Sequence, residues 1–170
     1  MKCWAKIAAL LLSVSALMVS AQSASDVQGQ AQETQARSFW TDPSTGLMWT
    51  AKDNGKDVIW KKAMKYCRDL RLAGYSDWRL TNMAELQGIY DSSANAPGRD
   101  GQGASTWHVK GKLFLTGNQW SGNYRLDDRG RPSGYAYYFD FNEGKPNEDP
   151  TGFLYPFTFM RALCVRGSGK

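Results

Sequence analysis

The feature of this sequence that most constrains its fold is a pair of widely separated cysteines, Cys67 and Cys164. If the third cysteine, Cys3, is removed with a signal peptide, only one pairing is possible, and in an oxidising compartment we expect a disulfide. Such a bond closes a loop of about a hundred residues, and the chain-entropy model assigns it about 4–5 kcal/mol of stabilisation. The alternative is that one of the two thiols has a redox or catalytic role.

The N-terminus predicts export into such a compartment. Lys2 and Lys6 supply positive charge, residues 7–19 (IAALLLSVSALMV) form an apolar run, and VSA at 19–21 provides the small residues of a cleavage site. This order is typical of a secretory signal peptide, and the run is shorter than the roughly 20 residues of a transmembrane helix. We predict a signal peptide over residues 1–21, with a retained membrane anchor as the alternative, and a periplasmic, secreted or cell-surface location.

The remaining chain is long enough for one domain. Residues 22–36 (QSASDVQGQAQETQA) contain a single large apolar residue and many Gln, Ser and Ala, which predicts a flexible linker. Residues 37–168 are then expected to fold around one core. Loss of residues 1–21 removes two of the 21 basic side chains and none of the 16 acidic ones, which leaves 19 against 16, a net charge of +3. This weak charge, in an exported protein, argues against nucleic acid as a partner.

Periodic patterns predict the first elements of the domain. The stretch 38–50 (SFWTDPSTGLMWT) has two short aromatic segments around turn-forming residues, which predicts a hairpin with Trp49 in the core. Apolar residues at helical spacing within 57–74, beginning with Trp60, predict an amphipathic helix that ends at Gly74.

The second half of the domain is predicted to be mostly strand and loop. Residues 118–124, 134–141 and 159–167 are expected to form strands, and the alternation within 134–141 predicts one buried face. Residues 91–118 are rich in Gly, Ser, Asp and Asn, which predicts long surface loops around a short apolar segment. The expected fold class is α+β: a small domain with an antiparallel sheet, two helices, long loops and one disulfide.

The stretch GYSDWRLTNMAEL concentrates polar and aromatic residues, and we interpret it as structural. Asn82 and Glu85 have the spacing of a capping box, in which each side chain bonds the backbone N–H of the other residue. Asp77 and Arg79 are two positions apart on a short strand, so they are expected to pair, or Asp77 to bond nearby backbone N–H groups. Trp78 is expected to face the core.

Several motifs of the chain resemble one bacterial family, the Lcl C-terminal domain, a domain of unknown function best known from the C-terminus of a collagen-like surface adhesin. The motifs, in chain order, are GLMW (46–49), GYSDWRL (74–80), WSG (120–122), YYFDFNEG (137–144) and RALCVRG (161–167). The resemblance implies a fold similar to C-type lectins and to the formylglycine-generating-enzyme group. It also implies an exported domain that presents loops for binding, with carbohydrate, especially sulfated glycosaminoglycan, as the ligand class.

One group of candidate ligand-binding residues lies on the predicted first helix. Lys61, Lys65 and Arg68 fall on one face of that helix by their spacing. Lysine and arginine are the side chains that meet sulfate or carboxylate groups of a glycan. The alternative is an ordinary solvated helix face.

A second group of candidates lies around residues 120–131. Sugar rings stack on aromatic side chains, and the segment combines aromatic and basic residues, although two aspartates interrupt its charge. Its candidate residues are Trp120, Tyr124, Arg125, Arg129 and Arg131.

No catalytic constellation is predicted. His108 is the only histidine and is interpreted as a surface loop residue, and no G-x-S-x-G nucleophile motif occurs. The closely spaced reactive cysteines of the sulfatase-modifying relatives are also absent, so we expect no enzyme activity and no cofactor. Residues 142–150 (NEGKPNEDP) offer oxygen donors suited to Ca²⁺; a solvated turn is the preferred interpretation and a Ca²⁺ site the alternative.

Two classes of function remain. The first is an exported binding module that recognises an extracellular polysaccharide or another surface ligand. The second is a structural or protein-interaction domain of the cell envelope without carbohydrate binding. Salt-dependent retention on a sulfated polysaccharide would distinguish them, because exposed charges are screened beyond about 10 Å at 0.1 M salt.

Overall fold

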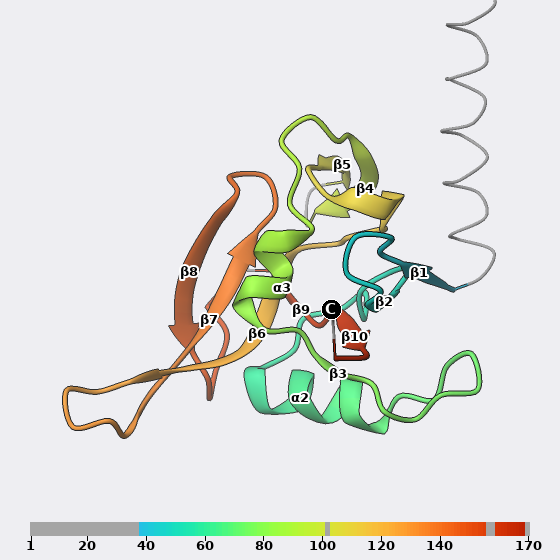
Figure 1. Cartoon of the computed structure of the whole chain (residues 1–170). Coiled ribbons are helices and arrows are strands. Elements are labelled where there is room, and N and C mark those ends of the chain that lie inside the picture. The colour runs from blue at the N-terminus through green and yellow to red at the C-terminus, as the bar shows by residue number, and fades with distance from the viewer. Residues whose placement is uncertain (1–37, 101–102, 156–158, 169–170) are drawn as a thin grey trace, which may run out of the picture.

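Figure 1 shows the fold in a computed structural model of the chain, which describes residues 38–100, 103–155 and 159–168. The described residues form two α-helices, one short 3₁₀ turn and three β-sheets. The predicted fold class, a small α+β domain with antiparallel sheets, two helices and one disulfide, is confirmed. The predicted signal peptide and linker lie outside the described residues.

The first sheet brings the two ends of the domain together. Its strand order is β1-β2-β10-β3, and all neighbouring strands are antiparallel. The predicted hairpin is confirmed as β1 and β2, and Trp49 is buried. The strands are β1 (Phe39–Thr41), β2 (Met48–Thr50), β3 (Arg79–Leu80) and β10 (Cys164–Arg166).

The second sheet has the order β8-β7-β6-β9, and its β6–β7 hairpin extends from the body of the molecule (Figure 1). One of its pairs, β6 with β9, is parallel, which the prediction of an antiparallel sheet did not include. The strands are β6 (Asn118–Leu126), β7 (Pro132–Asp140), β8 (Lys145–Pro150) and β9 (Met160–Arg161).

The interpretation of residues 142–150 as a solvated turn is wrong, because most of this segment is strand β8. It pairs with β7 along its whole length, from Tyr135 opposite Pro150 to Asp140 opposite Lys145. β8 lies at the edge of its sheet, where prolines and charged residues are tolerated and discourage further pairing. Its polar sequence is therefore that of an edge strand.

The prediction of a single strand over 159–167 is also wrong. Met160 and Arg161 pair with β6 in the second sheet, whereas Cys164 to Arg166 lie between β2 and β3 in the first. The two residues between these strands, Ala162 and Leu163, are fully buried. Met160 and residues 162–165 are apolar and buried because the segment crosses from one sheet to the other through the core.

The prediction of loops over residues 91–118 is wrong in part. The segment contains a third, two-stranded sheet, β4 (Ala96–Asp100) with β5 (Gly103–Trp107), and the 3₁₀ turn η1 (Lys110–Lys112). The hairpin is anchored in the core by Ala96 and Trp107, which pair at its base and are buried. A Cβ on Gly98 would lie 2.4 Å from Cδ1 of the Trp107 indole, so only glycine fits there.

The first described helix, α2 (Trp60–Asp69), carries one half of the predicted disulfide. Cys67 is buried on its inner side and is bonded to Cys164 of β10, with the two Cα atoms 5.4 Å apart. The helix ends earlier than predicted, because Leu70 is extended. Gly74 instead occupies a tight turn with positive φ between the bridged residues Leu72 and Tyr75.

The second described helix, α3 (Met83–Gly88), begins at the predicted capping box. Asn82 Oδ1 accepts the Glu85 backbone N–H at 2.8 Å, and Glu85 Oε2 accepts the Asn82 backbone N–H at 2.8 Å. Neither of the two described helices is long and apolar enough to span a membrane.

The predicted pairing of Asp77 with Arg79 is wrong. Asp77 accepts two hydrogen bonds from Arg166, whereas Arg79 pairs with Glu85. The alternation of side chains along a strand does not apply to Asp77, because β3 begins only at Arg79. Trp78 is buried as predicted and donates its Nε1–H to the Leu72 carbonyl oxygen at 3.3 Å.

The core consists of two clusters of buried side chains, and β7 contributes to both. Phe139, with Phe141 just after the strand, belongs to the cluster that includes α3 and Trp107, whereas Ala136 belongs to the cluster that includes Cys67 and the inner side of α2. The prediction that only one face of this strand is buried is therefore wrong. The second sheet lies between the two clusters and connects them.

Candidate functional site

The strongest concentration of one charge in the described part of the chain lies along α2 and the two residues that follow it. This α2 basic surface consists of five exposed cations: Lys61, Lys62, Lys65, Arg68 and Arg71. The only carboxylate within the same stretch is Asp69, which pairs with Lys65 and lies 3.7 Å from Arg68 Nε. The hydrogen bond from Lys65 lowers the pKa of Asp69. Five cations against one carboxylate leave a clear positive excess.

The α2 basic surface contains a shallow hollow of about 420 Å³. Lys62, Lys65 and Arg71 stand around it, and Tyr66, whose side chain is 39% exposed, lies in its wall. Arg71 is held in place because its Nη1 donates to the Leu70 carbonyl oxygen at 3.0 Å. The hollow therefore combines cations with an accessible aromatic ring.

The second predicted group, on the β6–β7 hairpin, is less suited to binding. Trp120 is fully buried and donates its Nε1–H to the Val58 carbonyl oxygen at 2.7 Å, so the interpretation of Trp120 as a sugar-stacking residue is wrong. β6 crosses the core beside α2, which sequence spacing alone does not reveal. Tyr124 is half-buried and meets Trp60 edge-on, with ring centroids 4.7 Å apart.

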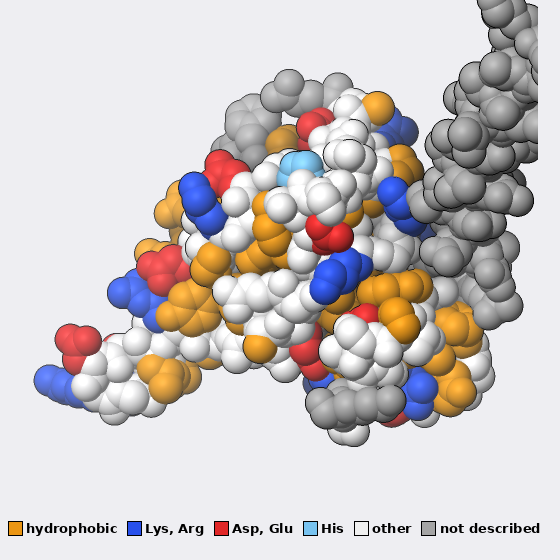
Figure 2. All heavy atoms as spheres, turned by 45° about the horizontal axis from the view of Figure 1, so that its top comes forward, with side chains coloured by type: hydrophobic (Ala, Val, Ile, Leu, Met, Phe, Trp, Pro, Cys, Tyr) orange, Lys and Arg blue, Asp and Glu red, His pale blue; other side chains and the backbone are white. Residues whose placement is uncertain are grey.

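The three arginines of this hairpin stand among three carboxylates. Arg125 pairs with Glu148 at 2.7 Å, and Arg131 pairs with Asp127 at 2.9 Å. Arg129 is exposed, with Asp128 next to it in the chain. Figure 2 shows positive and negative side chains side by side at the tip of the hairpin. The hairpin therefore has no excess of positive charge for an anionic ligand.

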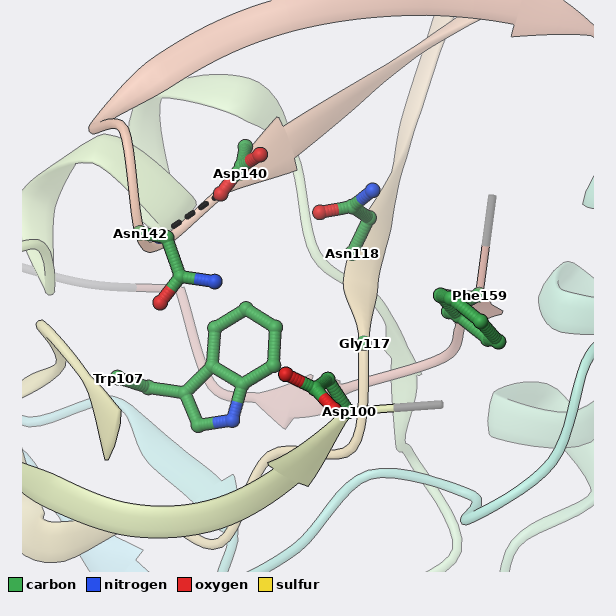
Figure 3. Close-up of a pocket in the computed structure, with 7 residues that line it drawn as sticks. All are labelled: Asp100, Trp107, Gly117, Asn118, Asp140, Asn142 and Phe159. Carbon is green, nitrogen blue, oxygen red and sulfur yellow. Dashed lines mark hydrogen bonds between the residues drawn. The ribbon is translucent and has the colours of Figure 1, made fainter. Parts of the chain in front are cut away.

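A polar pocket of about 210 Å³ lies between β4–β5 and the second sheet (Figure 3). The indole of Trp107 forms part of its wall, and the polar side chains that also line it are Asp100, Asn118, Asp140 and Asn142. Asp140 Oδ1 accepts the backbone N–H groups of Asn142 at 2.8 Å and Glu143 at 3.2 Å. The sequence analysis did not assign these residues to one site, because they come from four separate segments.

The predicted Ca²⁺ donors of residues 142–150 are not brought together. Asn142 lines the polar pocket, Glu148 pairs with Arg125, and Asp149 is buried on the opposite side of β8 from Glu148. In the part of the chain that the structure describes, no three His, Cys, Asp or Glu side chains form a group that could hold a metal ion.

His108 is less exposed than predicted. Its Nδ1 lies 2.8 Å from the Ala94 carbonyl oxygen, and its ring meets Tyr90 edge-on. The backbone N–H of His108 also donates to the Phe141 carbonyl oxygen at 3.2 Å. These contacts give His108 a role in connecting the β5 end to the second sheet.

Two comparisons with known proteins bear on this arrangement. No curated protein matches the chain. The family model of the Lcl C-terminal domain matches residues 38–163, which include both described helices and most of the strands. Because this match covers most of the chain, the chain belongs to the Lcl C-terminal domain family.

Proposed function

We propose that this protein is an exported, non-enzymatic binding module that recognises an anionic glycan, such as a sulfated polysaccharide, through the α2 basic surface. The observation that carries the proposal is the excess of five cations over one carboxylate on a single exposed surface. The disulfide is compatible with export to an oxidising compartment.

The chemistry of the α2 basic surface supports a polyanionic ligand. Lysine ammonium groups act as point charges for sulfate, and arginine guanidinium groups bond sulfate or carboxylate at two points. The exposed Tyr66 offers an aromatic face beside these cations. Because the cations are exposed, binding at this surface should weaken steeply with salt.

The described residues give little support for catalysis. Cys67 and Cys164 are bonded to each other, so neither is a free thiol nucleophile. Among the described residues, the His108 ring contacts the Ala94 carbonyl oxygen and the Tyr90 ring, and neither is a serine or cysteine nucleophile. A binding role is therefore the simpler proposal.

Retention of the oxidised protein on immobilised heparin across a salt gradient tests this proposal. The test variant replaces Lys61, Lys65 and Arg68 with Ala, and the matched control replaces Arg125, Arg129 and Arg131, the same number of charges. A Lys or Arg close to an anionic surface contributes about 1 kcal/mol. Three replacements on α2 should therefore weaken binding by on the order of a hundredfold, and the control should elute nearly with the wild type.

Two results would contradict the proposal. A loss of retention in the hairpin variant alone would move the site to the β6–β7 hairpin. Elution of the wild type at low salt would leave the second class of function, an envelope interaction domain without carbohydrate binding. The exposed pair Phe153 and Tyr155, with ring centroids 5.1 Å apart, is the surface that would then be tested first for a protein partner.

A further inference from the structure

The hollow on the α2 basic surface has a geometry that goes beyond net charge, and an inference from it rests on the proposed function. Two cations of its lining, Lys62 and Arg71, have no carboxylate partner among the described residues. The carboxylate in the lining, Asp69, is compensated by its ion pair with Lys65. The exposed ring of Tyr66 completes the wall, so the hollow is positive around an aromatic surface.

Arg71 is held where it can present two donors to a ligand. Its Nη1 donates to the carbonyl oxygens of Leu70 at 3.0 Å and Arg68 at 3.3 Å, at the C-terminal end of α2. Its Nε–H and Nη2–H groups have no partner among the described residues. A guanidinium edge bonds a sulfate or a carboxylate at two points, which a lysine ammonium cannot reproduce. Arg71 therefore offers a two-point site whose orientation is set before a ligand arrives.

Tyr66 supplies a surface for a sugar ring. Its side chain is 39% exposed in the wall of the hollow. Lys62 precedes it by one helical turn and Arg71 follows the end of α2, so a cation lies on each side of the ring along the helix. Burial raises the pKa of the Tyr66 hydroxyl, so the ring stays neutral beside an anionic ligand. An aromatic face packs against the C–H groups of a sugar, and a polyanion without rings gains nothing from it.

We propose that the hollow binds one anionic pyranose residue of the glycan, with its ring on Tyr66 and its sulfate or carboxylate group on Arg71. The volume of about 420 Å³ lies within the range of about 300–1,000 Å³ that holds small ligands. Because the hollow is shallow, the rest of a polysaccharide chain can continue past it over the other cations of the α2 basic surface. Tyr66 and Arg71 then determine specificity, and the other cations supply attraction that depends only on charge.

The test of Tyr66 compares polyanions with and without sugar rings, by isothermal titration calorimetry of the oxidised protein at one salt concentration. The probes are heparin and inorganic polyphosphate. We expect Tyr66→Ala to weaken heparin binding about 2- to 10-fold, the range for loss of one aromatic contact, and to leave polyphosphate binding unchanged. Tyr66→Phe keeps the ring and should bind heparin as the wild type does. Tyr135→Ala removes a tyrosine of similar exposure, 37%, from the β6–β7 hairpin, and this matched control should have no effect.

A charge-conserving variant tests Arg71. Arg71→Lys keeps the positive charge and loses the two-point geometry, so heparin binding should weaken about 2- to 10-fold, the range for one hydrogen bond. Arg129→Lys, at an exposed arginine of the hairpin tip, is the matched control and should bind as the wild type does. Dextran sulfate carries only sulfate and polygalacturonate only carboxylate, so the probe whose binding Arg71→Lys weakens identifies the group that Arg71 bonds.

Two results would overturn this inference and leave the proposed function intact. The first is that Tyr66→Ala weakens heparin binding no more than polyphosphate binding, which would show that the ring does not contact sugar. The second is that Arg71→Lys binds heparin as tightly as the wild type, which would show that only net charge matters at this position. All the substituted residues are exposed, so the variants should fold normally. A wild type that does not bind heparin at all would instead overturn the proposed function, and this inference with it.

Discussion

Arg79 and Glu85 form a salt bridge with two hydrogen bonds at the N-terminus of α3. Arg79 Nη1 donates to Glu85 Oε2 at 2.8 Å, and Nη2 donates to Oε1 at 2.5 Å. The same Oε2 accepts the backbone N–H of Asn82 at 2.8 Å. Because Arg79 lies in β3, a single carboxylate caps the helix and ties it to the first sheet.

Two substitutions of Glu85 should separate these roles. Glu85→Gln keeps an acceptor for the Asn82 N–H and loses the charge, whereas Glu85→Ala loses both. We expect Glu85→Ala to lower the free energy of unfolding by about 1–3 kcal/mol, from a cap of about 1 kcal/mol and a partly exposed ion pair. Glu85→Gln should lose less than half of that, as measured by urea unfolding. Equal losses in the two variants would show that the cap contributes nothing.

The disulfide should supply a large share of the stability. Its cysteines are 97 residues apart, so replacing both Cys67 and Cys164 with Ala should cost about 4–5 kcal/mol in the chain-entropy model. Urea unfolding with and without a reductant measures this. The reductant should lower the urea concentration at the midpoint of unfolding for the wild type and leave that of the double variant unchanged. A wild-type midpoint that does not change on full reduction would contradict this expectation.

Gly98 should be one of the least replaceable residues in the domain. A Cβ there would lie 2.3 Å from the Leu115 carbonyl oxygen and 2.4 Å from the Trp107 indole, and neither group can move away freely in the core. Gly98→Ala should therefore cost about 1–3 kcal/mol or more. The matched control is Gly88→Ala in α3, which has no atom within 4 Å of its Cβ and should be neutral or stabilise by up to about 1 kcal/mol. Thermal unfolding of the two variants distinguishes the steric effect from a general intolerance of alanine.

Elements set by local sequence could be predicted. The β1–β2 hairpin has its own turn residues, the capping box needs only Asn82 and Glu85, and Cys67 and Cys164 are the only cysteines of the predicted domain. The end of α2 was missed because Leu70 leaves the helix before Gly74 is reached, and the turn at Gly74 serves a different contact. Propensity places a glycine in a turn without saying which turn.

Elements that depend on a distant partner could not be predicted. β8 is charged and contains two prolines, and it is a strand only because β7 lies beside it. The polar pocket is a stronger case, since Asp100, Trp107, Asn118 and Asn142 meet only after the β4–β5 hairpin has packed against the second sheet. Most of the α2 basic surface could be found from the sequence because Lys61, Lys65 and Arg68 lie on one helix, whereas Arg71, which follows the helix, was not predicted.

The pH dependence of stability should reveal a buried carboxyl on β8. Asp149 is 5% exposed, its Oδ2 has no hydrogen-bond partner among the described residues, and burial raises its pKa above the ordinary value of 3.8. A carboxyl with a raised pKa binds its proton more tightly in the folded state. The free energy of unfolding should therefore fall as the pH rises from 3.8 through the raised pKa, and then level off.

Asp77 provides a control, because its pKa is shifted in the opposite direction from that of Asp149. The hydrogen bond from Arg166 lowers the pKa of Asp77, so the contribution of this pair to stability is present at neutral pH and is lost as the pH falls through the lowered pKa. Asp77→Asn should therefore destabilise the protein at pH 7 and have little effect in acid.

Asp149→Asn should stabilise the protein at pH 7 and have little effect in acid. At pH 7 it removes an unpaired buried charge and should raise the free energy of unfolding by about 1–3 kcal/mol. The gain should shrink as the pH falls below the raised pKa, because the wild-type carboxyl is then neutral as well. Urea unfolding of the wild type and both variants between pH 3 and pH 8 measures the three profiles. An Asp149→Asn variant that is less stable than the wild type at pH 7 would show that the carboxylate has a stabilising partner and that its burial does not work against folding.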